Sequence, residues 1–187
     1  MRRSGHIVFT ALLAGALLAA PLLTGCQTTA PPSATAARSK THSDGPGRVI
    51  TEKRGWTVEL HATDDRERAF CLARRAAAAP GLVFVAAARD SGFRLTGLPP
   101  RGDGDPAQIT ALFDDGERVP FQAHALDDRA LAVAFPTADY EDALYPFARS
   151  RTVEFHSGGG ALASFSLSGS SWAINATDEC RRMHTGS

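Results

Sequence analysis

Residues 82–95 read LVFVAAARDSGFRL, and this stretch carries the strongest indication of the fold. Leu82 to Val85 is apolar throughout and rich in residues that favour strands, which is typical of a strand in the middle of a sheet. Ser91-Gly92 favours a tight turn, and Phe93-Arg94-Leu95 then resumes an alternating pattern. The stretch therefore predicts a β-hairpin whose first strand lies at the centre of a sheet.

Short strands are also predicted on both sides of this hairpin. Trp56 to Leu60 alternates apolar and polar side chains, as a half-buried strand does. Clusters of turn-forming residues separate the other expected strands, which are 108–113, 119–123, 131–135, 152–155 and 162–167. We expect 119–123 and 131–135 to belong to one antiparallel set around Asp127-Asp128. The predicted fold class is mainly β, a small antiparallel β-sandwich or curled sheet with one or two short helices, stapled by one disulfide.

The first helical segment is expected within residues 139–148. Tyr140, Leu144 and Phe147 recur there at helical spacing. Pro146 disfavours helical geometry at the residue before it. We therefore expect one or two short helical turns rather than a full helix.

The second helix is expected to begin at Ser170 or Ser171 and to run to Cys180. Serine is a favourable residue at a helix start because its hydroxyl can accept from the first free backbone N–H groups. Helical spacing puts Trp172, Ala176 and Cys180 on one face. We expect this face to carry the tryptophan and the cysteine into the core together.

The first 25 residues are expected to be an export signal rather than part of the fold. Arg2 and Arg3 give a positive start, and the segment from Ile7 to Leu23 contains no charged residue. An apolar run of about 17–25 residues is also long enough for a short transmembrane helix. The position of the run, its basic flank and the small residues at its end favour a secretory signal.

Leu23-Thr24-Gly25-Cys26 resembles the lipobox of bacterial lipoproteins. The resemblance implies that the Cys26 thiol receives diacylglycerol, that residues 1–25 are removed and that the new amino terminus is acylated. Two or three acyl chains hold a protein firmly at a membrane. Gln27, where an aspartate would retain the protein in the inner membrane, implies the periplasmic face of the outer membrane of a Gram-negative cell. The alternative is an ordinary signal peptide with a chance cysteine.

Cleavage before Cys26 would leave 162 residues, enough for one domain after a tether. These hold 18 basic and 20 acidic residues, so the net charge of −2 creates no strong field for nucleic acid. Residues 26–54 are rich in Thr, Ala, Pro, Ser and Gly and predict a lipidated flexible tether. Residues 55–187 are expected to form the β-rich periplasmic domain.

Lipidation of Cys26 would leave Cys71 and Cys180. An even pair in an oxidising compartment is most simply one disulfide. The alternatives are a metal site or a catalytic thiol, and neither cysteine has a second ligand at CxxC or HxxxH spacing.

The order of motifs over residues 55–180 resembles that of the invasion-associated locus B-like proteins, which are small exported domains of proteobacteria. The shared features are an early Trp-x-Val strand, a following cysteine, a late Leu-x-Gly-Ser segment and a short helix that ends in a cysteine. Here they are Trp56 to Val58, Cys71, Leu167 to Ser170, and Cys180. The resemblance implies an envelope protein without a known catalytic site.

The sequence contains no complete catalytic motif. Leu167-Ser168-Gly169-Ser170 lacks the preceding glycine of a nucleophile elbow. His61, His124 and His156 are scattered over predicted strands or strand ends. The acid pairs Asp64-Asp65, Asp114-Asp115 and Asp127-Asp128 lie on predicted turns, where neighbouring carboxylates point in different directions. No phosphate-binding loop, haem motif or set of metal ligands appears, so no cofactor or metal is predicted.

The sequence therefore favours a non-enzymatic binding or interaction module of the bacterial envelope. Its lipid would bind the membrane, and its domain would bind another envelope protein, peptidoglycan or a small ligand. The alternative is a hydrolase whose histidines, aspartates and serines converge only in the folded chain. A structure that places His124 or His156 beside an acid and a serine in a pocket would favour this alternative.

Overall fold

The computed structural model describes residues 47–75, 79–100, 108–158 and 160–185. Within them the fold is mainly β, with two antiparallel sheets and two α-helices, as predicted. The larger sheet has the order β1 (Arg48–Lys53), β2 (Trp56–His61), β3 (Phe70–Arg75), β4 (Gly81–Ala87), β5 (Asp90–Thr96), β9 (Ala130–Pro136), β8 (His124–Asp127). The smaller sheet has the order β11 (Gly160–Ser166), β10 (Thr152–Ser157), β6 (Ile109–Phe113), β7 (Arg118–Phe121).

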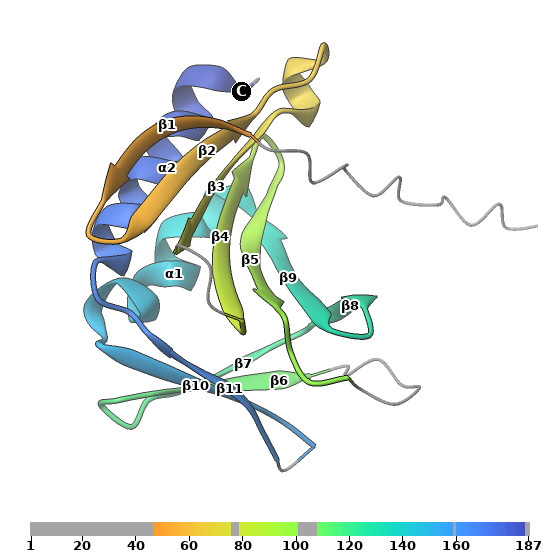
Figure 1. Ribbon diagram of the computed structural model, residues 1–187, viewed down its shortest axis with the longest axis vertical. Coiled ribbons are helices and arrows are strands. Elements are labelled where there is room, and N and C mark those ends of the chain that lie inside the picture. Colours follow the sequence, from red (N-terminus) through yellow and green to blue (C-terminus); the bar gives the residue numbers. More distant parts are fainter. Residues whose placement is uncertain (1–46, 76–78, 101–107, 159, 186–187) are drawn as a thin grey trace, which may run out of the picture. The chain divides into compact units, whose positions relative to one another are not determined.

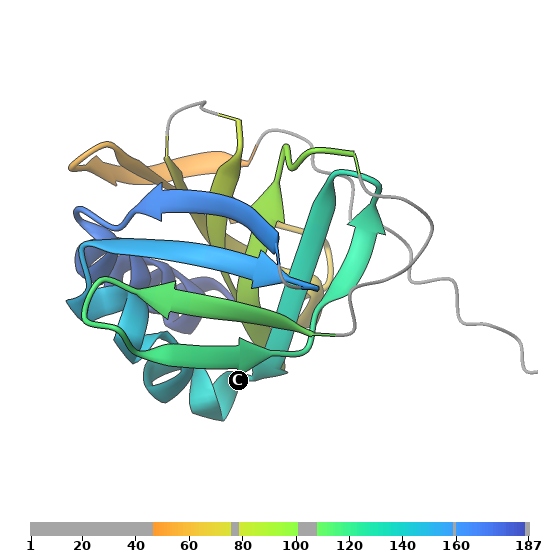
Figure 2. The ribbon, with the colours of Figure 1, turned by 90° about the horizontal axis from the view of Figure 1, so that it is seen from below.

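The helices and the smaller sheet pack against the larger sheet (Figure 1). Helix α1 (Tyr140–Arg149) follows the short 3-10 turn at Thr137–Asp139, and α2 (Ser170–His184) is the last element of the described chain; another 3-10 turn lies at Arg66–Arg68. Figure 2 shows the strands of the smaller sheet running across those of the larger one. Helix α2 lies against β2, β3 and β4.

The core is a cluster of aromatic rings centred on Phe147 of α1. Its ring lies 5.8 Å from that of Phe84 and 5.2 Å from that of Phe93, both in the larger sheet. It lies 5.0 Å from Phe113 and 6.1 Å from Phe155, both in the smaller sheet. Aromatic rings contribute large buried areas, so Phe147 joins both sheets into one core.

Helix α1 is longer than the one or two turns expected around Pro146. Its ten residues include Pro146, which is buried together with Tyr140, Leu144 and Phe147. Proline removes one helical hydrogen bond, but its carbonyl still accepts from Ser150 N at 3.2 Å. Burial of the apolar face outweighs this local cost.

Helix α2 begins at Ser170, as predicted, and continues past Cys180 to His184. The helix face of Trp172, Ala176 and Cys180 packs against the core, as expected, but only Cys180 on it is fully buried. Trp172 and Ala176 are only half-buried, whereas Ala173, Thr177 and Cys180 are buried. The buried tryptophan of this fold is instead Trp56, which is 1% exposed.

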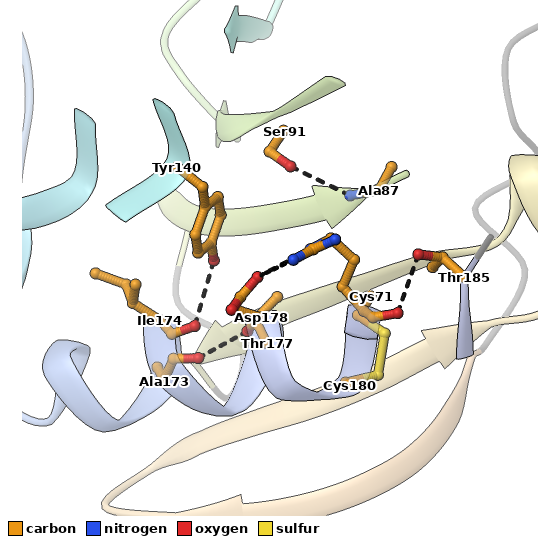
Figure 3. Close-up of a disulfide and its surroundings, with 11 residues drawn as sticks. Cys71, Ala87, Ser91, Tyr140, Ala173, Ile174, Thr177, Asp178, Cys180 and Thr185 are labelled. Atoms are coloured by element: carbon orange, nitrogen blue, oxygen red, sulfur yellow. Dashed lines mark hydrogen bonds and ion pairs between the residues drawn. A yellow bond between two sulfur atoms is a disulfide. The ribbon is translucent and has the colours of Figure 1, made fainter. Parts of the chain in front are cut away.

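The predicted disulfide between Cys71 and Cys180 is confirmed. The two Cα atoms lie 6.0 Å apart, and the bond joins β3 to the last turns of α2 (Figure 3). Cys71 lies within a strand that we did not predict, β3.

The hairpin predicted around residues 82–95 is confirmed, and its first strand, β4, is the fourth of seven in its sheet. Its turn, however, is not at Ser91-Gly92, because both residues lie inside β5. A Cβ atom at Gly92 would lie 1.9 Å from the backbone oxygen of Val133 in β9. Close approach of two strands, rather than a turn, therefore accounts for this glycine.

The segments predicted at 119–123 and 131–135 do not share a sheet. Strand β7 pairs with β6, whereas β9 pairs with β5 and with β8. The chain crosses from the smaller to the larger sheet between Phe121 and His124.

The domain begins earlier than the boundary predicted at residue 54. Residues 48–53 form β1, which pairs with β2. The sequence of β1 has charged residues at both ends and two adjacent apolar residues, Val49 and Ile50, so it lacks the alternation that identifies a half-buried strand. The predicted signal peptide (1–25), Cys26 and the rest of the predicted tether (27–46) lie outside the described residues. Among the described helices, none has the length and apolar character needed to cross a membrane.

Candidate functional site

A groove opens between the edge strand β11 of the smaller sheet and the end of the larger sheet near β3 and β4. It is lined by Trp56, by Arg74 and Arg75, by Pro80 to Val83, by Thr96 and by Ser164 to Ser166, and we call it the inter-sheet groove. Strand β11 is the uppermost strand of the smaller sheet in Figure 2. The volume is about 380 Å³, within the range of about 300–1,000 Å³ typical of ligand pockets.

Arg75 provides a cation at this groove. Its guanidinium lies 5.8 Å above the Trp56 ring, and its Nη1 donates to the carbonyl of Ser166 at 3.2 Å. Among the described residues, no carboxylate pairs with Arg75. Because a guanidinium has five N–H donors, most of its hydrogen-bonding capacity stays available to a ligand.

Arg74 lies next to Arg75 but is already paired. Its Nη2 lies 2.6 Å from a carboxylate oxygen of Glu59, which is 4% exposed, and its Nε donates to the same oxygen at 2.8 Å. The other oxygen of Glu59 lies 3.4 Å from Nε2 of His61, without hydrogen-bond geometry. The His61 ring stacks on Phe70, with centroids 4.6 Å apart. A buried carboxylate needs such partners, which gives Glu59, Arg74 and His61 a structural role.

A second hollow lies on the smaller sheet, beside His156 and Ser157. It has a volume of about 370 Å³ and is also lined by Gln108 and Arg118. Nε2 of His156 lies 3.1 Å from Oε1 of Glu154, but this contact also lacks hydrogen-bond geometry. The Ser157 hydroxyl donates to the Gln108 carbonyl at 3.4 Å. An acid, a histidine and a serine are thus neighbours here, but the serine does not bond to the histidine.

His124 does not join either site. It is exposed on the edge strand β8. The described acidic side chains do not pair with it.

The acid pairs stabilise turns. Asp114 accepts from the backbone N–H groups of Arg151 and Thr152, and the first of these bonds is the main cause that lowers the pKa of its carboxyl below the ordinary 3.8. The pKa of Asp115 is also lowered, first by the backbone N–H of Glu117 and then by Arg149. Carboxylates held in this way favour their charged form and are poor proton donors.

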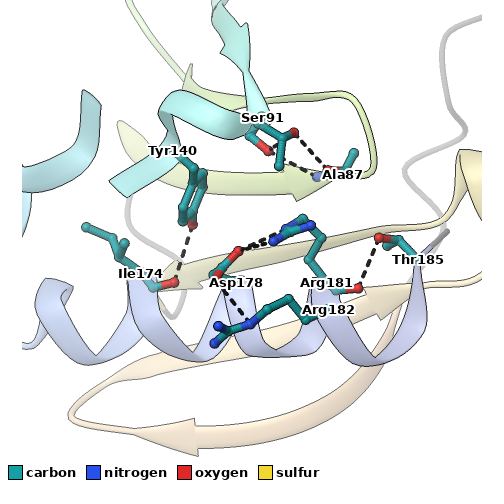
Figure 4. A network of polar contacts seen from close by, with 9 residues as sticks. Ala87, Ser91, Tyr140, Ile174, Asp178, Arg181, Arg182 and Thr185 are labelled. Carbon is teal, nitrogen blue, oxygen red and sulfur yellow. Dashed lines mark hydrogen bonds and ion pairs between the residues drawn. The ribbon is translucent and has the colours of Figure 1, made fainter. Parts of the chain in front are cut away.

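A polar network fixes α2 beside the disulfide (Figure 4). Asp178 lies 2.8 Å from Arg181 and 3.3 Å from Arg182. The Tyr140 hydroxyl donates to the carbonyl of Ile174 at 3.4 Å, and burial raises the pKa of this hydroxyl far above its ordinary range. The ion pairs lie within α2, and the Tyr140 bond joins α1 to α2, so this network has a structural role.

Sequence reasoning missed this groove because no single segment forms it. Trp56 comes from β2, Arg75 from β3 and Phe165 from β11. One local signal was present: residues 162–167 are expected in a strand yet contain no charge and no proline.

No family model, no curated protein and no solved structure matches the chain.

Proposed function

We propose that the chain is a lipid-anchored protein of the bacterial envelope that works as a non-enzymatic binding module. The lipobox Leu23-Thr24-Gly25-Cys26 supports the anchor, with lipid on Cys26. Gln27 supports the periplasmic face of the outer membrane in a Gram-negative cell. The inter-sheet groove is the proposed binding site, and its occupant is another component of the envelope rather than nucleic acid.

One observation carries the binding role. Arg75 is an exposed cation without a carboxylate partner in the described part of the chain, and it lies over an indole at the groove. Arg75 donates to the Ser166 carbonyl, but its charge is not neutralised by a described carboxylate, whereas Glu59 neutralises neighbouring Arg74. A groove with aromatic walls and an available guanidinium suits a ligand with both an apolar and an anionic part.

The anchor is tested by Cys26→Ser. The variant is expected to lose incorporation of an alkyne-tagged fatty acid and to leave the membrane fraction. Thr28→Ser is the matched control, because it changes a residue near Cys26 and leaves both the lipobox and the Cys71–Cys180 disulfide intact. Labelling that persists in Cys26→Ser would contradict the anchor.

The binding role is tested by photocrosslinking in cells. A benzoylphenylalanine placed at Val83, which lines the groove, is expected to give a reproducible crosslinked product with an envelope component. The same residue at Met183, exposed on α2, is the control and is expected to give none. Equal crosslinking at both positions, or at neither, would contradict a binding site in the groove.

The alternative is a hydrolase, and the neighbouring Glu154, His156 and Ser157 favour it. A fluorophosphonate probe, which labels activated serines, decides between the two. The binding module predicts no labelling, whereas labelling that disappears in Ser157→Ala would establish the hydrolase.

A further inference from the structure

We infer that the free edge of β11 binds an extended acidic peptide as an added strand inside the inter-sheet groove. This inference rests on the proposed function, because it identifies the occupant of the same groove. It follows from the pairing of β11, from the composition of the sheet edges and from the charge of Arg75.

The register of β11 shows which of its backbone groups face the groove. Leu167 N donates to Arg151 O at 2.7 Å, and Ser166 lies opposite Thr152. In an antiparallel pair the bonded positions alternate, so the backbone groups of Ser164 and Ser166 point away from β10. The bond from Arg75 to the Ser166 carbonyl agrees with this direction.

Three of the four outward backbone groups of Ser164 and Ser166 are available for hydrogen bonds to a ligand. Within the described structure, the N–H and carbonyl of Ser164 and the N–H of Ser166 have no hydrogen-bond partner, and both residues line the groove. An extended peptide beside β11 would supply an acceptor, a donor and an acceptor in that order. Strand addition of this kind derives its affinity from main-chain hydrogen bonds.

The other sheet edges carry features that discourage strand addition. Strand β7 contains Pro120, β8 is four residues long and β1 carries Arg48, Glu52 and Lys53. The seven residues of β11 include neither a charge nor a proline. Proteins normally protect their edges by such devices, so an unprotected edge beside a groove is typical of a docking strand.

The charge of the groove selects an acidic peptide over a second copy of this chain. Arg75 lies beside the outward carbonyl of Ser166, where it can reach a carboxylate on an added strand. A second β11 has no acidic residue to offer to it. An acidic side chain would form a charge-assisted hydrogen bond with Arg75, which is stronger than one between neutral groups.

The test measures retention of defined peptides on the full chain, processed in a bacterial host and immobilised in detergent. The probes are two mixtures of acetylated, amidated heptapeptides with a central Glu or a central Gln, the other positions randomised over Val, Ile, Thr, Ser, Ala, Phe and Tyr. Mass spectrometry identifies the retained peptides. The Glu mixture is expected to be retained about tenfold more than the Gln mixture, the difference that one charge-assisted bond supplies.

Two variants localise this retention. Ser164→Pro removes an outward N–H without removing a bond to β10, so the fold is expected to survive while retention is lost; Ser164→Ala is its control. Arg75→Gln is expected to abolish the preference for Glu, whereas Arg118→Gln, which removes an arginine from β7, keeps it.

A retained peptide is also resynthesised with N-methyl groups at each position in turn, which keeps the test valid even if Ser164→Pro does not fold. Loss of binding at alternate positions is expected. Retention that is insensitive to N-methylation, or no retention of the Glu mixture, would overturn the peptide assignment. If benzoylphenylalanine at position 83 still gave a crosslinked product in cells, the proposed binding role would stand even though the peptide assignment had failed. A chain that is a dimer in solution and that Ser164→Pro converts to a monomer would identify a second copy as the occupant and overturn the peptide.

Discussion

The indole N–H of Trp56 donates to the backbone carbonyl of Ser168 at 2.9 Å, across 112 positions of the chain. Trp56 opens β2, and Ser168 lies in the turn before α2. Together with the bond from Arg75 to Ser166, this contact fastens the end of β11 to the larger sheet. The position of β11 beside the groove therefore depends on a side chain near the other end of the domain.

Replacing Trp56 by Phe is expected to destabilise the fold by about 1–3 kcal/mol, because the Ser168 carbonyl loses its donor and the smaller ring leaves a void. Urea denaturation measures this change through the fluorescence of the remaining tryptophan. Trp172→Phe is the matched control, since Trp172 is only half-buried, and it is expected to cost less. A larger loss from Trp172→Phe would show that the wrong tryptophan has been placed in the core.

Removing the disulfide by Cys71→Ala with Cys180→Ala is expected to lower the free energy of unfolding by about 4–5 kcal/mol. In the chain-entropy model, this is the effect of closing a loop of about 100 residues. The two cysteines are 109 positions apart. Denaturation with and without reductant measures the change: reductant should weaken the native domain and leave the double variant unaffected. Alkylation of unreduced native protein should find no free thiol at these positions.

Gly92→Ala is expected to prevent formation of the native sheet. The new Cβ would lie 1.9 Å from the Val133 oxygen, a backbone atom that cannot move without separating β5 from β9. Gly116→Ala is the control: it has a positive φ of 87° but nothing within 4 Å of the new Cβ, so a loss of about 1 kcal/mol is expected. Circular dichroism and soluble yield compare the two. Equal effects would show that β5 and β9 do not approach this closely.

The lowered pKa of Asp114 predicts that the domain loses part of its stability at acid pH. Its folded-state pKa is lowered below the ordinary 3.8 by the backbone N–H of Arg151. A lowered folded pKa stabilises the fold above the unfolded pKa, and this stabilisation is lost as the pH falls through the folded value. Asp114→Asn should therefore lower the unfolding midpoint near neutral pH and flatten its decline below about pH 4. Parallel curves for variant and native protein would contradict this role.

The strands that were predicted correctly are those whose own residues show an apolar or alternating pattern. Leu82 to Val85 forms the central strand β4, and Trp56 to Leu60 lies in β2, because their own side chains carry the pattern of burial. The helix start at Ser170 and the cysteine pair could likewise be predicted from the sequence, the pair because the expected lipidation of Cys26 would leave only two thiols.

The errors occurred where distant residues decide the conformation. Gly92 lies in a strand because Val133 passes close to it, a contact with no trace in residues 82–95. Pro146 is tolerated in α1 because Phe147 completes the aromatic core. The inter-sheet groove was inaccessible for the same reason, since Arg75 and Ser164 meet only after both sheets have formed.

The cross-link at Cys71 also sets how the domain would bear mechanical load from the proposed membrane anchor. A force applied through the residues before Gly47 acts first on β1, an edge strand that pairs with β2 alone. The hydrogen bonds between β1 and β2 can therefore break one after another. The same peeling can then remove β2 from β3. The peeling stops at Cys71, because the disulfide joins this residue covalently to Cys180 in α2. The disulfide then carries the force, and the residues between the two cysteines are shielded from it. Of the residues that line the inter-sheet groove, all except Trp56 lie within that shielded stretch.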